Sequence, residues 1–161
     1  MHLRCEMPYA APPDAVFAML ADPEFRRAVC ADQDVERVEV TITRDGPGMS
    51  VCIDQHQPTQ GVPAFATAII GATTHVIQLE EWADETTASL ELKTPGKPAT
   101  MHGTIEILPD GDGALEVVEL EVKATVPFIG GRLERLMGDL VRRSIEAENV
   151  TGAAWLAGER R

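Results

Sequence analysis

The sequence predicts an α+β fold in which a curved, seven-stranded antiparallel sheet wraps around one long C-terminal helix, with two short helices after strand 1. Between residues 37 and 126, six consecutive segments alternate apolar and polar residues, as half-buried strands do. An apolar stripe at helical spacing then covers 131–157, about 40 Å of helix. Since 161 residues fit roughly one domain, we predict a single domain over 1–158 and a C-terminal tail over 159–161.

The N-terminal segment predicts a strand followed by two short helices. Residues 2–9 alternate, with one face formed by Leu3, Cys5, Met7 and Tyr9. A helical apolar pattern follows and stops at Asp22-Pro23. Pro23 suits the first turn of a second helix, and Asp22 suits its N-cap.

A hairpin and a further short helix come next. The alternating segments 38–43 and 49–56 flank the turn sequence Asp45-Gly46-Pro47-Gly48, which predicts an antiparallel pair. Residues 62–71 predict a helix with Gly71 as its C-cap. We expect access to the interior between this helix, the loop 44–48 and the start of the long helix.

The last four strands are predicted over 74–83, 86–94, 100–108 and 114–126. In the first of them, His75 shares a face with the apolar Ile77 and is predicted to point inward. In the last, the apolar face changes between Val117 and Leu120, which predicts a β-bulge near Val118.

Composition excludes several classes of function. Fourteen basic and 26 acidic residues give a net charge of −12, which disfavours nucleic acid and anionic membrane surfaces as partners. We identify no apolar segment of about 18 residues and no secretory leader, so no membrane span is expected. Cys5, Cys30 and Cys52 are odd in number and widely spaced, which predicts free thiols in a cytoplasmic protein.

Much of the negative charge is predicted to lie on the solvent faces of strands. A glutamate near the end of the long helix, Glu148, is also expected to be solvated. The strand residues assigned to solvent are Glu36, Glu39, Glu80, Glu91, Glu106, Glu116, Glu119 and Glu121.

Three sequence segments carry a family resemblance. Residues 126–134 read Val-Pro-Phe-Ile-Gly-Gly-Arg-Leu-Glu, residues 80–82 read Glu-Glu-Trp, and residues 151–156 read Thr-Gly-Ala-Ala-Trp-Leu. Over about 1–158 the chain resembles a bacterial family of START-like proteins catalogued as domain of unknown function number 2505. The resemblance implies the helix-grip fold of the START-like (SRPBCC) superfamily, which includes the birch-pollen-allergen and polyketide-cyclase types. It also implies a hydrophobic cavity under the long helix. The family has no established catalytic residues, so the resemblance assigns no catalytic role to any residue of this chain.

The leading hypothesis is that this cavity binds a small hydrophobic or amphipathic molecule, of lipid, isoprenoid or polyketide type. Aromatic residues make up only 4% of the chain, so few rings are available to fill a wide gap, although a fully packed core remains the alternative. Gln55, His75 and Ser144 would orient the ligand. The predicted binding residues are Met49, Val51, Ile53, Gln55, Phe65, His75, Ile77, Leu90, Met101, Ile105, Leu133, Met137, Leu140, Val141 and Ser144.

Two other functions remain open. A cyclase- or hydrolase-like enzyme of the same superfamily would need converging titratable groups, such as His75 with Glu81 or Glu148. A protein-interaction module would need no ligand. The sequence lacks a nucleophile elbow and a phosphate-binding glycine loop, which favours a protein that is not an enzyme. Its histidines lack the short spacing of a zinc site, so we predict no metal and no cofactor. The oligomeric state is not predicted.

Overall fold

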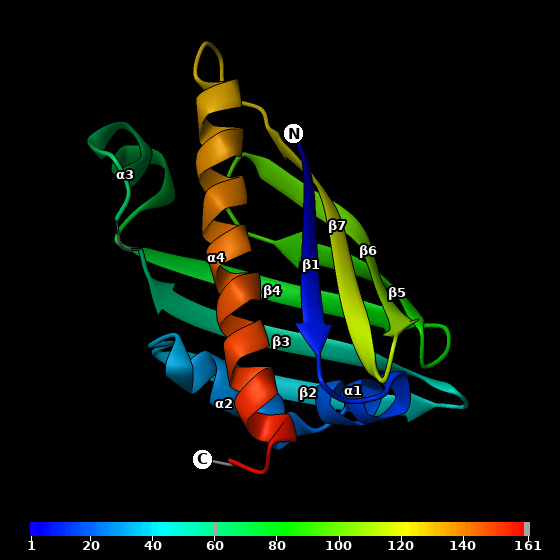
Figure 1. The fold of residues 1–161 in the computed structure, drawn as a ribbon. Coiled ribbons are helices and arrows are strands. Elements are labelled where there is room, and N and C mark those ends of the chain that lie inside the picture. Colours follow the sequence, from blue (N-terminus) through cyan, green and yellow to red (C-terminus); the bar gives the residue numbers. More distant parts are fainter. Residues whose placement is uncertain (60, 160–161) are drawn as a thin grey trace.

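The structure, a computed structural model, describes residues 1–59 and 61–159 (Figure 1). Most of the tail predicted over 159–161 therefore lies outside the described residues. The elements follow the predicted order: β1 (His2–Tyr9), α1 (Pro13–Leu20), α2 (Pro23–Asp32), β2 (Arg37–Asp45), β3 (Gly48–Pro58), α3 (Ala64–Ile70), β4 (Thr73–Trp82), β5 (Thr87–Lys93), β6 (Ala99–Asp110), β7 (Gly113–Ala124) and α4 (Gly130–Leu156).

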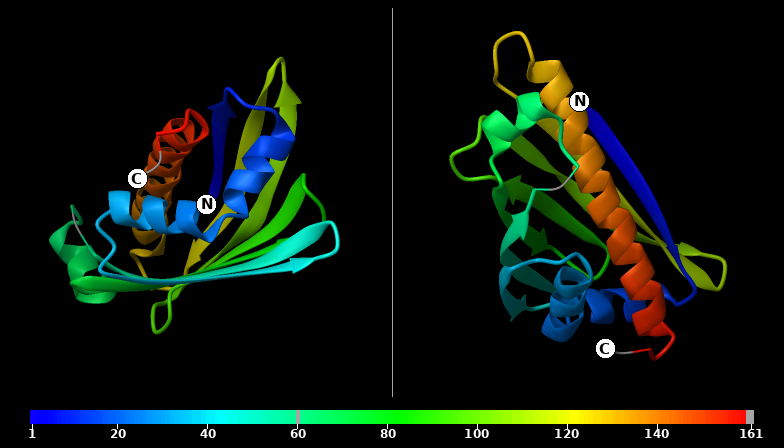
Figure 2. Two further views of the ribbon diagram at one scale, coloured as in Figure 1. Left: turned by 90° about the horizontal axis from the view of Figure 1, so that it is seen from below. Right: turned by 90° about the vertical axis from the view of Figure 1, so that its left-hand side faces the viewer.

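The seven strands form one antiparallel sheet in the order β1-β7-β6-β5-β4-β3-β2. The long helix α4 runs across one face of this curved sheet (Figures 1 and 2). In the same views, α3 lies beside the N-terminal part of α4, and α1 and α2 lie beside its C-terminal part. These features confirm the predicted α+β helix-grip architecture.

The second helix begins as its sequence predicts. The Asp22 side chain accepts a hydrogen bond from the backbone amide of Glu24 at 2.9 Å, and Pro23 occupies the first turn. This contact satisfies one of the amides that a helix start leaves without a partner. The same end of the helix places Phe25 and Arg26 on its buried face.

The predicted bulge in the last strand is wrong. Strand β7 pairs with β6 and with β1 in unbroken register, from Gly113 to Ala124 and from Ala114 to Glu121 respectively. One face is therefore continuous along β7, and it carries Glu116 inward between Ala114 and Val118. On the neighbouring strand, a Cβ at Gly103 would lie 1.7 Å from the Glu119 carbonyl oxygen, so the backbones approach there more closely than any side chain permits.

Two glutamates assigned to solvent are buried instead. Glu80 and Glu116 are 0% and 2% exposed, because each lies on the inward face of its strand. The other strand glutamates are exposed or half-buried, as predicted. All three cysteines are free, with Cys52 half-buried. Within the described residues, none of the helices is both long enough and apolar enough to cross a membrane.

Candidate functional site

A cavity of about 390 Å³ lies between α4 and the sheet. Its floor is formed by inward residues of β4 to β7 and its roof by one stripe of α4. The end of β3, the loop after α2 and helix α3 complete its rim. Much of the wall is apolar, with contributions from Met7, Leu90, Met101, Leu120, Leu133 and Met137.

Many of the predicted binding residues lie on this wall. They are Gln55, Leu90, Met101, Ile105, Leu133, Met137, Leu140, Val141 and Ser144. The Ser144 hydroxyl donates to the Gln33 side-chain oxygen at 2.7 Å, and the Cys30 thiol donates to the Gln55 side-chain oxygen at 3.6 Å. Two of the three polar residues predicted to orient a ligand, Gln55 and Ser144, therefore already have a protein partner.

Other predicted binding residues lie elsewhere. Met49, Val51 and Ile53 are buried in the core and do not line the cavity. The ring of Phe65 is half-buried on α3, and the guanidinium of Arg132 lies 4.2 Å from its centre. This cation–π contact links α3 to the first turn of α4.

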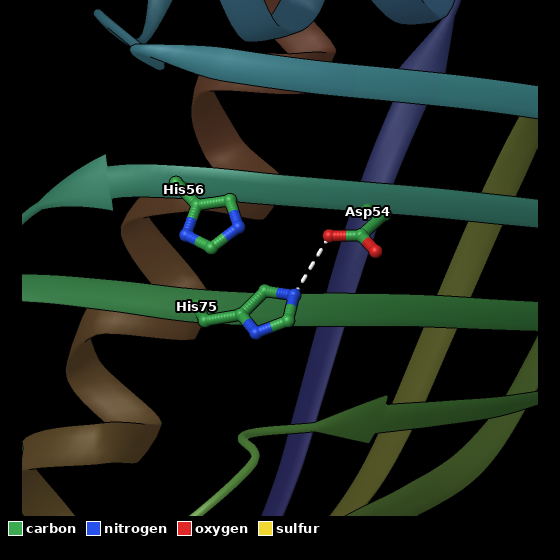
Figure 3. A group of neighbouring side chains, drawn as sticks. All are labelled: Asp54, His56 and His75. Atoms are coloured by element: carbon green, nitrogen blue, oxygen red, sulfur yellow. Dashed lines mark hydrogen bonds and ion pairs between the residues drawn. The ribbon is translucent and has the colours of Figure 1, made fainter.

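The inward orientation predicted for His75 and Ile77 is wrong. The cavity is lined by Thr74, Val76 and Gln78 of the same strand, and successive side chains of a strand point to opposite faces. His75 therefore lies on the outer face of the sheet, where it contacts Asp54 and His56 of β3 (Figure 3). Without His75, the predicted acid–base pair with Glu148 cannot form inside the cavity.

The predicted entrance is wrong in one of its three boundaries. The rim includes Gln57, Pro58 and Ile69, but the loop 44–48, all of which the structure describes, contributes no residue to it. Strand β3 runs from Gly48 to Pro58, so this loop lies about 33 Å from the cavity end of the strand.

A buried ion pair lies at one end of the cavity. Both terminal nitrogens of Arg26 donate to the Glu80 carboxylate, at 3.0 and 2.8 Å, and the Arg26 Nε donates to the Leu20 carbonyl at 2.7 Å. Gln78 and Trp82 also donate to Glu80, at 2.6 and 2.8 Å. Five hydrogen bonds thus hold two charges that would otherwise be costly to bury.

Two further carboxyls, those of Glu116 and Glu148, line the same part of the wall, so Glu148 is half-buried rather than fully solvated as predicted. Burial raises the pKa of Glu116 well above its usual range, and Glu148 adds to the shift while Arg26 opposes it. Burial also raises the pKa of Glu148, which Arg26 opposes and Glu80 reinforces. The carboxyls of Glu80, Glu116 and Glu148 lie near the single guanidinium of Arg26. This carboxyl cluster therefore keeps a proton at pH values at which exposed glutamates are ionised.

This assignment predicts how stability depends on pH. A carboxyl whose pKa is raised in the folded state binds a proton there that the unfolded chain releases, so the free energy of unfolding falls as pH rises above about 4.3. We expect the free energy of unfolding of Glu116→Gln to fall less steeply with rising pH than that of wild type. Its stability relative to wild type should rise by up to about 1.4 kcal/mol per pH unit per proton, until the folded-state pKa is passed.

Urea unfolding at a series of pH values between 5 and 8 measures this difference. Glu106→Gln on the exposed face of β6 is the matched control and should follow the wild-type curve. Parallel curves for wild type and Glu116→Gln would contradict a raised pKa at Glu116.

A second buried polar group lies toward the other end of the cavity. Among the described residues, Thr94 Oγ1 and Glu116 Oε2 line the cavity and are buried without a hydrogen-bond partner. On β6, Met101 lies opposite Leu92, near Thr94, and Ile107 lies opposite Glu116. About 20 Å of strand β6 separates Met101 from Ile107. The cavity is therefore elongated, with an unsatisfied polar atom toward each end.

Four residues of the site were not predicted from the sequence: Arg26, Glu80, Glu116 and Thr94. One unbroken alternation from Ala114 to Val122 would have placed Glu116 inward without a bulge. Glu80 shares its strand face with Trp82, the largest apolar residue of β4, which also indicated burial. Buried charges are rare enough that composition argues against them at any single position.

Comparisons with known proteins agree with this architecture. The family described as "Protein of unknown function (DUF2505)" matches residues 4–156. The uncharacterized protein Rv0481c of Mycobacterium tuberculosis is 24% identical over 104 residues, and the match covers 61% of this chain. The chain spans about 60% of the length of this relative.

Solved structures share the fold at low sequence identity. The protein TTHA0849 from Thermus thermophilus superposes with a TM-score of 0.67 at 22% identity, over 100% of both chains. The ZhuI aromatase/cyclase from Streptomyces sp. R1128 gives 0.63 at 15% identity, over 100% of this chain and 96% of that one. A START superfamily protein from Mycobacterium smegmatis gives 0.60 at 16%, over 92% and 94%. The chain belongs to the DUF2505 family and has the helix-grip fold of START-like proteins.

Proposed function

We propose that the cavity binds one elongated amphipathic molecule of lipid, isoprenoid or polyketide type. The observation that carries this proposal is the apolar cavity with the buried Glu116 carboxyl in its wall, whose Oε2 has no hydrogen-bond partner among the residues that the structure describes. Burial of apolar ligand surface would supply about 25 cal/mol per Å² before the entropic costs of binding. The polar atoms at the two ends would fix the orientation of the ligand.

The charge at the Glu116 end selects the chemistry of the ligand head. A carboxylate head placed there would face Glu80, Glu116 and Glu148, and the Arg26 guanidinium beside them is already paired with Glu80. A protonated Glu116 can instead donate a hydrogen bond to a carbonyl or hydroxyl oxygen and accept one from a hydroxyl. We therefore expect a neutral, oxygen-bearing head at this end and an apolar body along α4.

A fluorescent probe tests this function directly. 1-Aminoanthracene should bind with one site per chain, and 1-decanol should displace it with a Kd about tenfold lower than that of decanoate. The expected difference corresponds to about 1.4 kcal/mol for placing an anion beside the carboxyls. Glu116→Gln should bind the probe and should reduce the preference for the alcohol. Absence of saturable probe binding, or equal displacement by both competitors, would overturn the proposal.

A second candidate function is acid–base catalysis in the same cavity. Two carboxyls with raised pKa values are the kind of groups that donate and accept protons near neutral pH. One protein of the same fold is described as an aromatase/cyclase. In this alternative, Glu116 would protonate a ligand carbonyl and Glu148 would accept a proton from the adjacent carbon.

A β-ketoacyl thioester incubated with the protein distinguishes the two functions. Catalysis predicts faster exchange of the α-carbon hydrogens for deuterium in D2O, measured by mass spectrometry, which Glu116→Gln abolishes while probe binding persists. Exchange at the rate seen without protein, at saturating protein, would leave binding as the function.

A further inference from the structure

Three potential metal ligands meet on the outer face of the sheet. Asp54 and His56 are two residues apart on β3 and so share a face, and His56 lies opposite His75 of β4. His75 Nε2 lies 2.7 Å from Asp54 Oδ1, and the two imidazole rings stack with centres 4.1 Å apart (Figure 3). One ligand atom from each residue lies within 4.8 Å of the other two.

We propose that Asp54, His56 and His75 bind a divalent transition-metal ion of the Zn²⁺ type. Two imidazoles and one carboxylate form a donor set that such ions take, with bonds of about 2.0–2.2 Å. Ligand atoms around a tetrahedral ion of that size are separated by about 3.3 Å. Small side-chain rotations would bring the three groups to that spacing, and a water molecule would supply the fourth ligand.

The surroundings favour a cation at this place. Glu39 of β2 lies directly opposite Asp54 on the same face, and like charges in this position destabilise a sheet. A bound ion would offset that repulsion. Side chains of His75 and Asp54 are 31% and 41% exposed, so an ion can reach them from solvent.

The neighbouring thiol is not expected to take part. Cys52 lies one step further along the same face of β3. Its Sγ is not among the ligand atoms that lie within 4.8 Å of one another.

The proposed ion lies on the outer face of the sheet, directly behind a part of the sheet that lines the cavity on its inner face. Gln57 follows His56 and Thr74 precedes His75, and both of these neighbours line the cavity on the opposite face. An ion bound across the two histidines would link β3 to β4 where the chain leaves for α3 and returns. Metal binding and ligand binding are therefore separate properties that can be measured independently.

Titration calorimetry of EDTA-treated protein with ZnCl₂ tests the site. We expect one ion per chain in wild type, loss of that binding in His56→Ala and in His75→Ala, and no change in His102→Ala, which removes an exposed histidine from the same outer face. Asp54→Asn is a further variant of unchanged shape, and it should weaken binding about tenfold or more. Circular dichroism confirms that each variant is folded.

Absorption of the Co²⁺-loaded protein provides a second readout. Histidine nitrogen ligation predicts a visible spectrum that His75→Ala lacks and His102→Ala retains. No saturable Zn²⁺ binding to folded wild type, or equal binding by wild type and His56→Ala, would overturn the proposal.

Discussion

Substitution of Arg26 by methionine should lower the free energy of unfolding by about 3–5 kcal/mol, the scale on which loss of one partner of a buried ion pair destabilises a protein. The guanidinium is 2% exposed and makes three hydrogen bonds, two of them to Glu80. Without it, the Glu80 carboxyl is buried beside two other carboxyls and has lost its counter-charge. Chemical denaturation at pH 7 measures the loss.

A matched control is offered by the next residue in the same helix. Arg27 is exposed and forms a surface ion pair with the exposed Glu24, so Arg27→Met should stay close to wild-type stability. The double variant Arg26→Met/Glu80→Gln should be more stable than Arg26→Met alone, because it replaces the carboxyl that has lost its partner by a neutral amide and keeps an acceptor for Trp82. If Arg26→Met and Arg27→Met lowered the free energy of unfolding by the same amount, the buried ion pair would not stabilise the fold more than an exposed one does.

Filling the cavity from the helix side should abolish ligand binding. Ala147 lies on the cavity-lining stripe of α4, and a phenyl ring at this position would occupy space that the ligand needs. We expect Ala147→Phe to raise the Kd of 1-aminoanthracene by more than about 100-fold, equivalent to about 2.8 kcal/mol. Fluorescence titration gives the Kd, and thermal unfolding confirms that the variant is folded.

The corresponding control introduces the same ring outside the cavity. Ala153 is exposed on the last turns of α4, so Ala153→Phe makes the same change in composition without entering the cavity. Its probe affinity should match that of wild type. If Ala147→Phe binds the probe as tightly as Ala153→Phe does, the probe occupies another place.

The architecture was predictable because local patterns agree with one another along most of the chain. Alternation puts apolar residues on one face of β1 and β5 throughout, and on one face of β3 and β6 at most positions, with Gln55 and Gly103 as exceptions. Asp22-Pro23 marks the start of α2. The 27-residue helix α4 could cover a curled sheet only by lying along it. Each of these inferences depends on short-range regularity, which sequence alone displays.

The candidate site was only partly predictable because its polar residues contradict that regularity. In β4 both faces carry apolar residues, so His75 and Ile77 looked as suitable for the interior as Val76 and Gln78 do. Glu80 is buried only because Arg26, 54 positions earlier in the chain, supplies its counter-charge. Pairing of this kind depends on tertiary contact between α2 and β4, and no spacing rule reveals it.

The same limit applies to the outer face of the sheet. The spacing of His56 and His75 in the sequence resembles no metal motif, so no metal site was predicted. Antiparallel pairing of β3 with β4 brings them opposite each other. The trio therefore becomes visible only when strand register is known.

Native mass spectrometry of the purified protein with a panel of neutral and anionic lipophilic compounds tests the central claim most directly. The panel would include fatty alcohols, isoprenoid alcohols, polyketide-like ketones and the corresponding carboxylates. We expect one-to-one complexes that favour the neutral compounds, are lost in Ala147→Phe and persist in Ala153→Phe. A wild-type spectrum without any retained compound, or complexes unchanged by Ala147→Phe, would contradict a ligand-binding role for the cavity.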